Sequence, residues 1–108
     1  MAGLSVFTAR NNARRSSPGL RGPIPTSIAK LLGLYEFDVS DNRLSGTIPP
    51  EVANLEYLTK FIVTQNNLSG SVPELMCREK DGLDEEPIDI KVDCRVSCPE
   101  GCCTDYAC

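Results

Sequence analysis

Hydrophobic and polar residues alternate in two segments of the chain that lie 24 positions apart. In one segment Phe37 and Val39 alternate with polar neighbours, and in the other Phe61 and Val63 occupy the same positions, with Lys60, Ile62 and Thr64 facing out. An alternation with a period of two is typical of a strand that buries one face and exposes the other. We therefore predict two short strands whose apolar side chains point toward a core.

These strands belong to a longer repeat of 24 residues. A fixed period of this size predicts a solenoid of α/β type, in which each repeat buries its apolar edge against its neighbours and the strands stack as a parallel sheet. Such a fold favours binding over catalysis. The matched positions are Ile24, Pro25, Ile28, Leu31, Leu34, Phe37, Val39, Asn42, Leu44 and Gly46 in one copy, and Ile48, Pro49, Val52, Leu55, Leu58, Phe61, Val63, Asn66, Leu68 and Gly70 in the next.

Each predicted strand is followed by residues that suit a turn and a return path. Asn42 and Asn66 end the strands, and their amide groups can bond backbone atoms that a turn leaves unpaired, so we assign them a structural role. The Leu-Ser-Gly-x-Ile/Val-Pro segments that follow suit a short edge strand or an extended turn. Residues 26–31 and 51–55 have i, i+3 apolar spacing, which predicts a one-turn helix or a 3₁₀ segment.

The amino-terminal part is less regular. Phe7, Ala9 and Asn12 fit the strand pattern, but Asn12 and Leu20 are separated by six residues more than the equivalent positions of the later copies. We expect these extra residues to form a loop. The strand lacks a preceding polar or disulfide-bonded cap, so we expect the natural chain to begin further upstream. Residues 1–19 are thus interpreted as an irregular or truncated first repeat, and residues 20–76 as the regular repeats.

Residues 77–108 are interpreted as a cysteine-rich carboxy-terminal cap. Residues 88–94 alternate like a strand, and we expect them to add one last strand to the sheet. Six cysteines in a small domain indicate that disulfides stabilise the fold in addition to the burial of apolar residues. Stable disulfides in turn imply an oxidising compartment. The cysteines are Cys77, Cys94, Cys98, Cys102, Cys103 and Cys108.

The spacing of these cysteines leaves their pairing open. Six cysteines allow fifteen connectivities, and the adjacent Cys102 and Cys103 are expected to bond different partners because a vicinal bridge is strained. A zinc site is the alternative interpretation of so dense a cluster of thiols. The absence of paired C-x2-C motifs and of histidine makes it the weaker one, so we predict no metal.

Composition removes several functional classes. The chain contains no histidine, which excludes catalytic sites and metal sites that depend on imidazole. Its formal charge is −4, with an excess of basic residues in the first thirty and of acidic residues in the last thirty-five. The arginines lack interleaved aromatic residues, so we expect no nucleic-acid partner. Neither paired carboxylates nor the acidic segment 81–86 matches a catalytic or EF-hand pattern, and we expect no enzyme and no cofactor.

The asparagine-leucine-Ser-Gly-x-Ile-Pro signature, quoted above for residues 20–76, resembles the plant-type leucine-rich repeat. The cysteine-rich ending is similar, more weakly, to that of leucine-rich-repeat proteins of diatoms and related algae. The resemblance implies a short segment of a right-handed horseshoe with a parallel sheet on its concave face. It also implies that this concave face binds a protein or peptide, as in the ectodomains of receptor-like kinases and in secreted inhibitors of pectin-degrading enzymes.

Outward-facing strand positions should form rows across the concave face. The rows are Val6 with Glu36 and Lys60, Thr8 with Asp38 and Ile62, Arg10 with Ser40 and Thr64, and Asn11 with Asp41 and Gln65. We take Glu36, Asp38, Ser40, Asp41, Lys60, Ile62, Thr64 and Gln65 as candidate partner-binding residues, because the fold does not require them. The alternative is an ordinary solvated face, on which Glu36 and Lys60 pair with each other.

The sequence predicts a non-catalytic protein- or peptide-binding module of a secreted or cell-surface protein. Asn67-Leu68-Ser69 is an N-glycosylation sequon that is usable only in the secretory path. The chain shows neither a signal peptide nor a membrane span. The alternatives are the carboxy-terminal ectodomain fragment of a receptor-like kinase, or a structural protein of the cell wall or extracellular matrix, with cell-wall polysaccharide as an alternative ligand.

Overall fold

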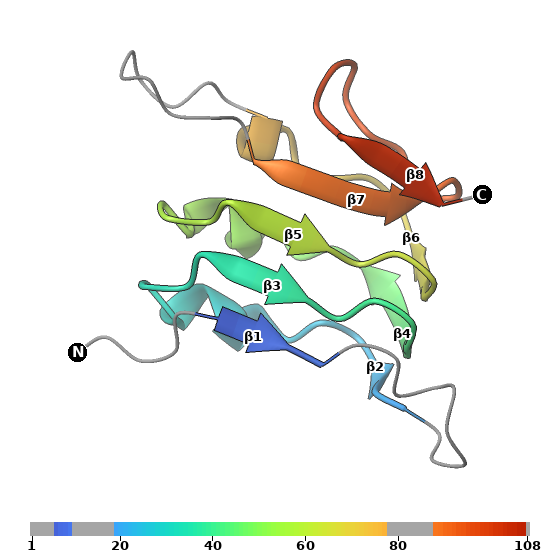
Figure 1. Cartoon of the computed structure of the whole chain (residues 1–108), viewed down its shortest axis with the longest axis horizontal. Helices are drawn as coiled ribbons and strands as arrows, with labels where there is room; N and C mark the ends of the chain where they lie inside the picture. The colour runs from blue at the N-terminus through green and yellow to red at the C-terminus, as the bar shows by residue number, and fades with distance from the viewer. Residues whose placement is uncertain (1–5, 10–18, 78–87, 108) are drawn as a thin grey trace.

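The computed structural model describes residues 6–9, 19–77 and 88–107. Within them, parallel strands stack side by side into one curved sheet in the order β1-β3-β5-β7-β8, as Figure 1 shows. The order follows the sequence because each repeat contributes one strand to this sheet. The strands are β1 (Val6–Thr8), β3 (Glu36–Asp38), β5 (Lys60–Ile62), β7 (Asp89–Asp93) and β8 (Asp105–Ala107).

The alternating segments form the predicted strands, and the carboxy-terminal end contains one strand more than predicted. β7 confirms the strand expected in residues 88–94. The expectation that it is the last strand was wrong, because β8 pairs with it in parallel, with Val92 opposite Tyr106. The β8 segment is three residues long and gives little sequence pattern of its own. Its position is determined by the neighbouring strand.

The return paths form a second layer of short elements. The predicted 3₁₀ segments are confirmed as η2 (Thr26–Lys30) and η3 (Pro50–Asn54), and η4 (Glu74–Cys77) is a third. Pro50 opens η3, where its missing N–H costs no helical hydrogen bond. A small parallel sheet forms from β2 (Arg21–Gly22) and from the strands of the two Leu-Ser-Gly segments, β4 (Arg43–Thr47) and β6 (Asn67–Ser69).

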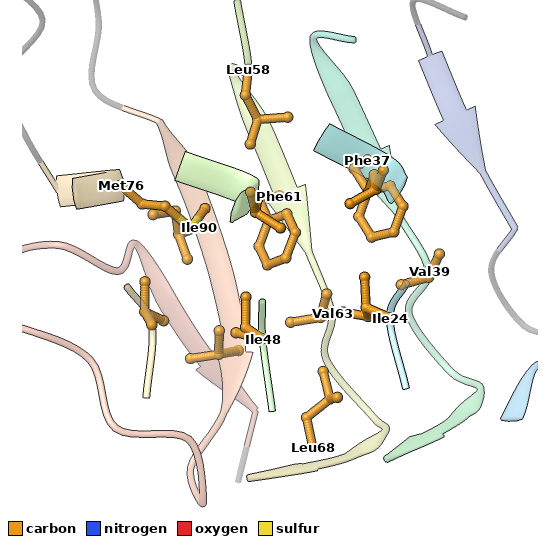
Figure 2. Packing of buried hydrophobic residues seen from close by; sticks show 14 of the residues in the cluster. Ile24, Phe37, Val39, Ile48, Leu58, Phe61, Val63, Leu68, Met76 and Ile90 are labelled. Carbon is orange, nitrogen blue, oxygen red and sulfur yellow. The ribbon is translucent and has the colours of Figure 1, made fainter. Parts of the chain in front are cut away.

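The core lies between the two layers and runs through all described repeats (Figure 2). Phe61, Leu34 and Leu68 are fully buried, which removes their apolar surface from water and stabilises the fold. The rings of Phe7, Phe37 and Phe61 stack on one another, with centroids 5.5 Å apart in each pair. The repeat period therefore builds a continuous aromatic column, because the same residue occupies the same position in three successive strands.

Asn42 and Asn66 hold the turns at the ends of β3 and β5. The Asn42 amide donates to the carbonyls of Ala9, Val39 and Ser40, and its Oδ1 accepts from the backbone N–H of Leu20. Asn66 makes the equivalent set one repeat later, and its Oδ1 accepts from the N–H of Leu44. Each amide thus joins two repeats, which explains why asparagine recurs with the period.

Disulfides fix the cap to the last repeat. Cys77, at the end of η4, bonds Cys102, and Cys98 bonds Cys103. Cys94 is also disulfide-bonded. Because Cys102 bonds Cys77 and Cys103 bonds Cys98, the two adjacent cysteines have different partners, as predicted. The bridge from Cys77 spans 25 residues of sequence, so it ties the carboxy-terminal segment to the repeats themselves.

Candidate functional site

The concave face of the large sheet collects the outward-facing side chains in rows. The pairing register places Glu36 beside Lys60, and Asp38 beside Ile62. The rows continue into the cap, where Lys60 is opposite Asp89 and Ile62 is opposite Lys91. At the other edge Val6 and Thr8 extend the same rows. The sheet therefore brings the central candidate residues together in two neighbouring rows, with β7 as an unforeseen third contributor.

The row through Lys60 alternates in charge. Lys60 lies between two acidic residues, and its Nζ atom is 4.0 Å from Glu36 Oε1 at a solvent-exposed site. An exposed pair of this kind contributes about 0–1 kcal/mol to stability. Asp38 accepts hydrogen bonds from the backbone N–H and the hydroxyl of Ser40, at 3.1 and 2.8 Å. Asp38 and Ser40 are thereby held in position on the face.

Ile62 is the apolar residue at the centre of the face. It lies between Asp38 and Lys91 in its row and is half-buried, whereas Phe61 and Val63 on either side of it point into the core and are fully buried. Its packing is therefore incomplete in the free protein. A partner that covers it would remove further apolar surface from water.

Asp41 and Gln65 lie at the edge of the face, where the backbone bends. Their φ angles are 59° and 58°, in the left-handed region that few residues other than glycine adopt. Asp41 donates its backbone N–H to the Thr64 carbonyl of the next repeat. Both residues thus serve the turn that precedes the asparagines. This role is separate from the partner-binding role that the sequence suggested for them.

Asp93 performs a structural task that sequence reasoning missed. In the inner repeat, the N–H groups of Asp41 and Asn42 donate to carbonyls of the following repeat. In the last repeat, the carboxylate of Asp93 accepts the equivalent N–H groups of Gln65 and Asn66, at 2.6 and 3.0 Å. A side chain thus replaces the carbonyls of a further repeat. Asp93 is the last residue of β7, and no local sequence pattern marks it as a hydrogen-bond acceptor for the preceding repeat.

The predicted glycosylation site is on the side of the solenoid, away from the concave face. Asn67 opens β6 and is exposed, and its Oδ1 accepts a hydrogen bond of 2.7 Å from Arg95. Ser69, the third residue of the sequon, is exposed as well. A glycan would be attached to Asn67 Nδ2, and this hydrogen bond involves Oδ1 instead.

A cavity of about 400 Å³ lies between β1, β3 and η2. Its wall is largely apolar and includes Phe7, Ile24, Ile28 and Phe37. None of the predicted partner-binding residues lines it. The cavity therefore belongs to the packing of the first described repeat and is distinct from the concave face.

Several sequence-based expectations lie outside the described residues. Arg10, Asn11 and most of the predicted insertion are among them, as are Cys108 and the acidic segment 81–86. Among the described residues, the side chains close enough together to share a metal ion are the cysteines Cys98, Cys102 and Cys103. In the structure all three are in disulfides, which are not metal ligands.

Comparisons with known proteins identify the repeat. Residues 33–55 match the family model of the leucine-rich repeat. A comparison with curated protein sequences finds no match. In the part of the chain that the structure describes, no helix is long and apolar enough to cross a membrane.

Solved structures of plant proteins share the fold. The BIR2 ectodomain from Arabidopsis thaliana is 39% identical over 56% of this chain, with a TM-score of 0.54. BIR3 in its complex with SERK2, also from Arabidopsis thaliana, is 38% identical over the same share, with a TM-score of 0.53. The plant peptide hormone receptor RGFR1 in complex with RGF2 is 26% identical over 88% of this chain, with a TM-score of 0.62. The matches cover 32%, 32% and 13% of those chains.

Proposed function

We propose that this chain, which carries leucine-rich repeats of the plant type, is a non-catalytic module that binds a protein or peptide on its concave face. The observation that carries the proposal is the pair of outward rows formed by β3, β5 and β7. The core and the asparagine turns use the inward side chains and the backbone, so the outward residues are available to a partner.

The chemistry of the face indicates the kind of partner. Ile62 offers a partly buried apolar contact, and Asp38, Lys60 and Lys91 surround it with both signs of charge. A peptide with one aliphatic or aromatic side chain, flanked by charged residues of both signs, complements this arrangement. The apolar contact would supply most of the affinity, and the charges would orient the peptide.

Two similar structures are complexes, one of BIR3 with SERK2 and one of RGFR1 with RGF2. They support a protein or peptide as the ligand class for this chain. The disulfides of the cap support a secreted or cell-surface location, since such bonds persist in oxidising compartments. The likeness to the BIR2 ectodomain favours a part of a receptor ectodomain over a cell-wall structural protein.

Selection from a library of random peptides tests the proposal. The intact oxidised protein should enrich a family of related peptides, and Asp38→Ala/Ile62→Ala should lose binding to them by at least tenfold. Glu51→Ala/Leu75→Ala is the matched control, because it removes an exposed acid and an exposed leucine from η3 and η4, away from the sheet. That control should bind like the parent protein.

The folded state of both variants is checked by circular dichroism and urea unfolding. If the double substitution on the sheet leaves peptide affinity unchanged, the concave face is not the binding site. If the control loses affinity instead, the site lies on the return segments.

A further inference from the structure

Three cysteine sulfurs cluster in the cap, and a fourth is bonded to one of them. The Sγ atoms of Cys98, Cys102 and Cys103 all lie within 4.8 Å of one another, and Cys77 is bonded to Cys102. A set of four cysteines is a common ligand set of structural zinc sites. We propose that reduction of these two bridges converts the group into a tetrathiolate site for Zn²⁺.

The distances fit such a site. A tetrahedral zinc ion with Zn–S bonds of about 2.3 Å holds its sulfurs about 3.8 Å apart. Among Cys98, Cys102 and Cys103, sulfurs that are not bonded to each other need to approach by about 1 Å at most. Cys77 lies outside this set, so its sulfur has farther to move, and the two bonded pairs need to separate by about 2 Å. Rotations of the cysteine side chains supply displacements of this size without a change of backbone.

Backbone hydrogen bonds hold the four cysteines in place independently of the bridges. Cys77 lies in η4, where the Met76 N–H donates to Pro73 and the Met76 side chain is buried in the core. Cys98 follows Ser97, whose N–H and carbonyl bond Gly70 and Val72 of the last repeat.

The remaining two cysteines are held in the same way. The N–H of Cys102 donates to Pro99, and Thr104, directly after Cys103, donates its N–H to the Ile90 carbonyl in β7. These hydrogen bonds do not involve the sulfurs, so we expect the fold to keep the four thiols near one another after the disulfides open.

The ligand chemistry selects the kind of ion. The group consists of sulfur ligands without a carboxylate among the described residues, which favours Zn²⁺ or another thiophilic ion over Ca²⁺ or Mg²⁺. The four cysteines pack against the core, and Cys102 is the most buried of the group that it forms with Cys98 and Cys103. The apolar surroundings would limit the access of water to a bound ion.

The chemistry of the conversion balances. Each bridge accepts two electrons and two protons from a dithiol reductant, which becomes a cyclic disulfide, so two dithiols yield four cysteine thiols. Zn²⁺ then binds four thiolates and releases their four protons to solvent. Two equivalents of a small disulfide would reverse the sequence, because each takes up two electrons and becomes two thiols while one bridge re-forms and the ion is released.

Cobalt binding tests the proposal, because Co²⁺ occupies thiolate sites and is coloured there. The full chain is reduced with a phosphine reductant, freed of it under nitrogen, and titrated with Co²⁺. We expect the visible absorption of tetrahedral Co²⁺ and a sulfur-to-metal charge-transfer band, which saturate at one ion per chain and vanish when Zn²⁺ is added. The unreduced protein should show neither band.

Variants assign the ligands. Cys102→Ser should weaken Co²⁺ binding by at least tenfold and reduce the charge-transfer intensity. Cys94→Ser/Cys108→Ser is the matched control, because it removes the two cysteines outside the group, and it should keep the full spectrum. Loss of the spectrum in the control, or its retention in Cys102→Ser, would overturn the assignment.

A second measurement guards against a variant that does not fold. Zn²⁺ should raise the thermal unfolding temperature of the reduced parent protein, and the reduced parent should bind Co²⁺ at least tenfold more tightly in buffer than in concentrated urea. Equal affinity in urea would show that the fold does not assemble the site, and would contradict the proposal.

Discussion

The two intact repeats, residues 24–47 and 48–71, share a backbone and differ in the side chains that they present to solvent. Phe37 and Phe61 occupy the same buried position, and the turns after both strands pass through the left-handed region at almost the same angle. On the concave side, however, the first strand presents two acids where the second presents Lys60 and Ile62. The comparison teaches that packing constrains the inward positions, whereas the outward positions vary without altering the fold.

The largest effect is expected from the aromatic column. Phe61→Ala should lower the free energy of unfolding by about 4 kcal/mol, because the side chain is fully buried between two stacked repeats. Phe37→Ala should cost less, since Phe37 also borders the cavity beside β1. Urea unfolding measures both. Equal losses would show that the two repeats are packed equally well.

The second-largest loss of stability is expected from substitutions in the asparagine turns. Asn42→Ala removes four hydrogen bonds, two within its own turn and two to the preceding repeat, and should cost about 3 kcal/mol. Asn42→Asp keeps the size and the acceptor for Leu20 but loses the donors, so it should cost at least as much. Asn54→Ala, at an exposed position of η3, serves as the control and should change stability by less than about 0.5 kcal/mol. A stable Asn42→Asp variant would contradict the assigned role.

Substitutions of Gly46 and Gly70 distinguish the cost of backbone strain from the cost of a steric contact. Both have a φ angle of 79°, so either substitution by alanine should cost about 1 kcal/mol in backbone strain. At Gly70 the new Cβ would also lie 2.9 Å from Thr47 Cγ2, whereas at Gly46 its nearest atom is 3.7 Å away. Gly70→Ala should therefore cost about 2 kcal/mol.

A double-mutant cycle checks this difference. Thr47→Ser removes the methyl group and should lower the cost of Gly70→Ala to that of Gly46→Ala. If Gly70→Ala costs as much in the Thr47→Ser background as in the parent protein, the contact with Thr47 is not the cause of the extra cost.

Much of this architecture can be predicted from the sequence, because the same pattern of apolar positions occurs in two copies of the repeat. The alternation at Phe37 and Val39 predicts which side chains face the core, and a period of 24 residues fixes which strand positions lie side by side. The candidate face followed from the same register. The contribution of a third strand, β7, to these rows required the structure, because the cap does not repeat the motif.

What the sequence left open depends on contacts that have no local pattern. Asp93 bonds two N–H groups 27 and 28 residues away, and its neighbourhood in sequence resembles any strand end. The left-handed backbone conformation of Asp41 and Gln65 could not be predicted from the sequence either, because such a position is usually occupied by glycine. The pairing of Cys77 with Cys102 is likewise determined by the folded cap, because spacing alone permits fifteen connectivities.

The central claim is that the inward residues determine the fold and the outward residues are free to serve recognition. It is tested most directly by exchanging the faces of the two repeats in the variant Glu36→Lys/Asp38→Ile/Lys60→Glu/Ile62→Asp, and by measuring its urea unfolding. The exchange keeps composition and net charge, and it preserves the cross-strand ion pair in reversed order. The exchange also places an acid opposite Asp89 and removes the hydrogen bonds of Asp38 with Ser40, so we predict an unfolding free energy within about 1.5 kcal/mol of the parent protein. A loss of several kcal/mol would show that the outward residues support the fold, and would contradict the account.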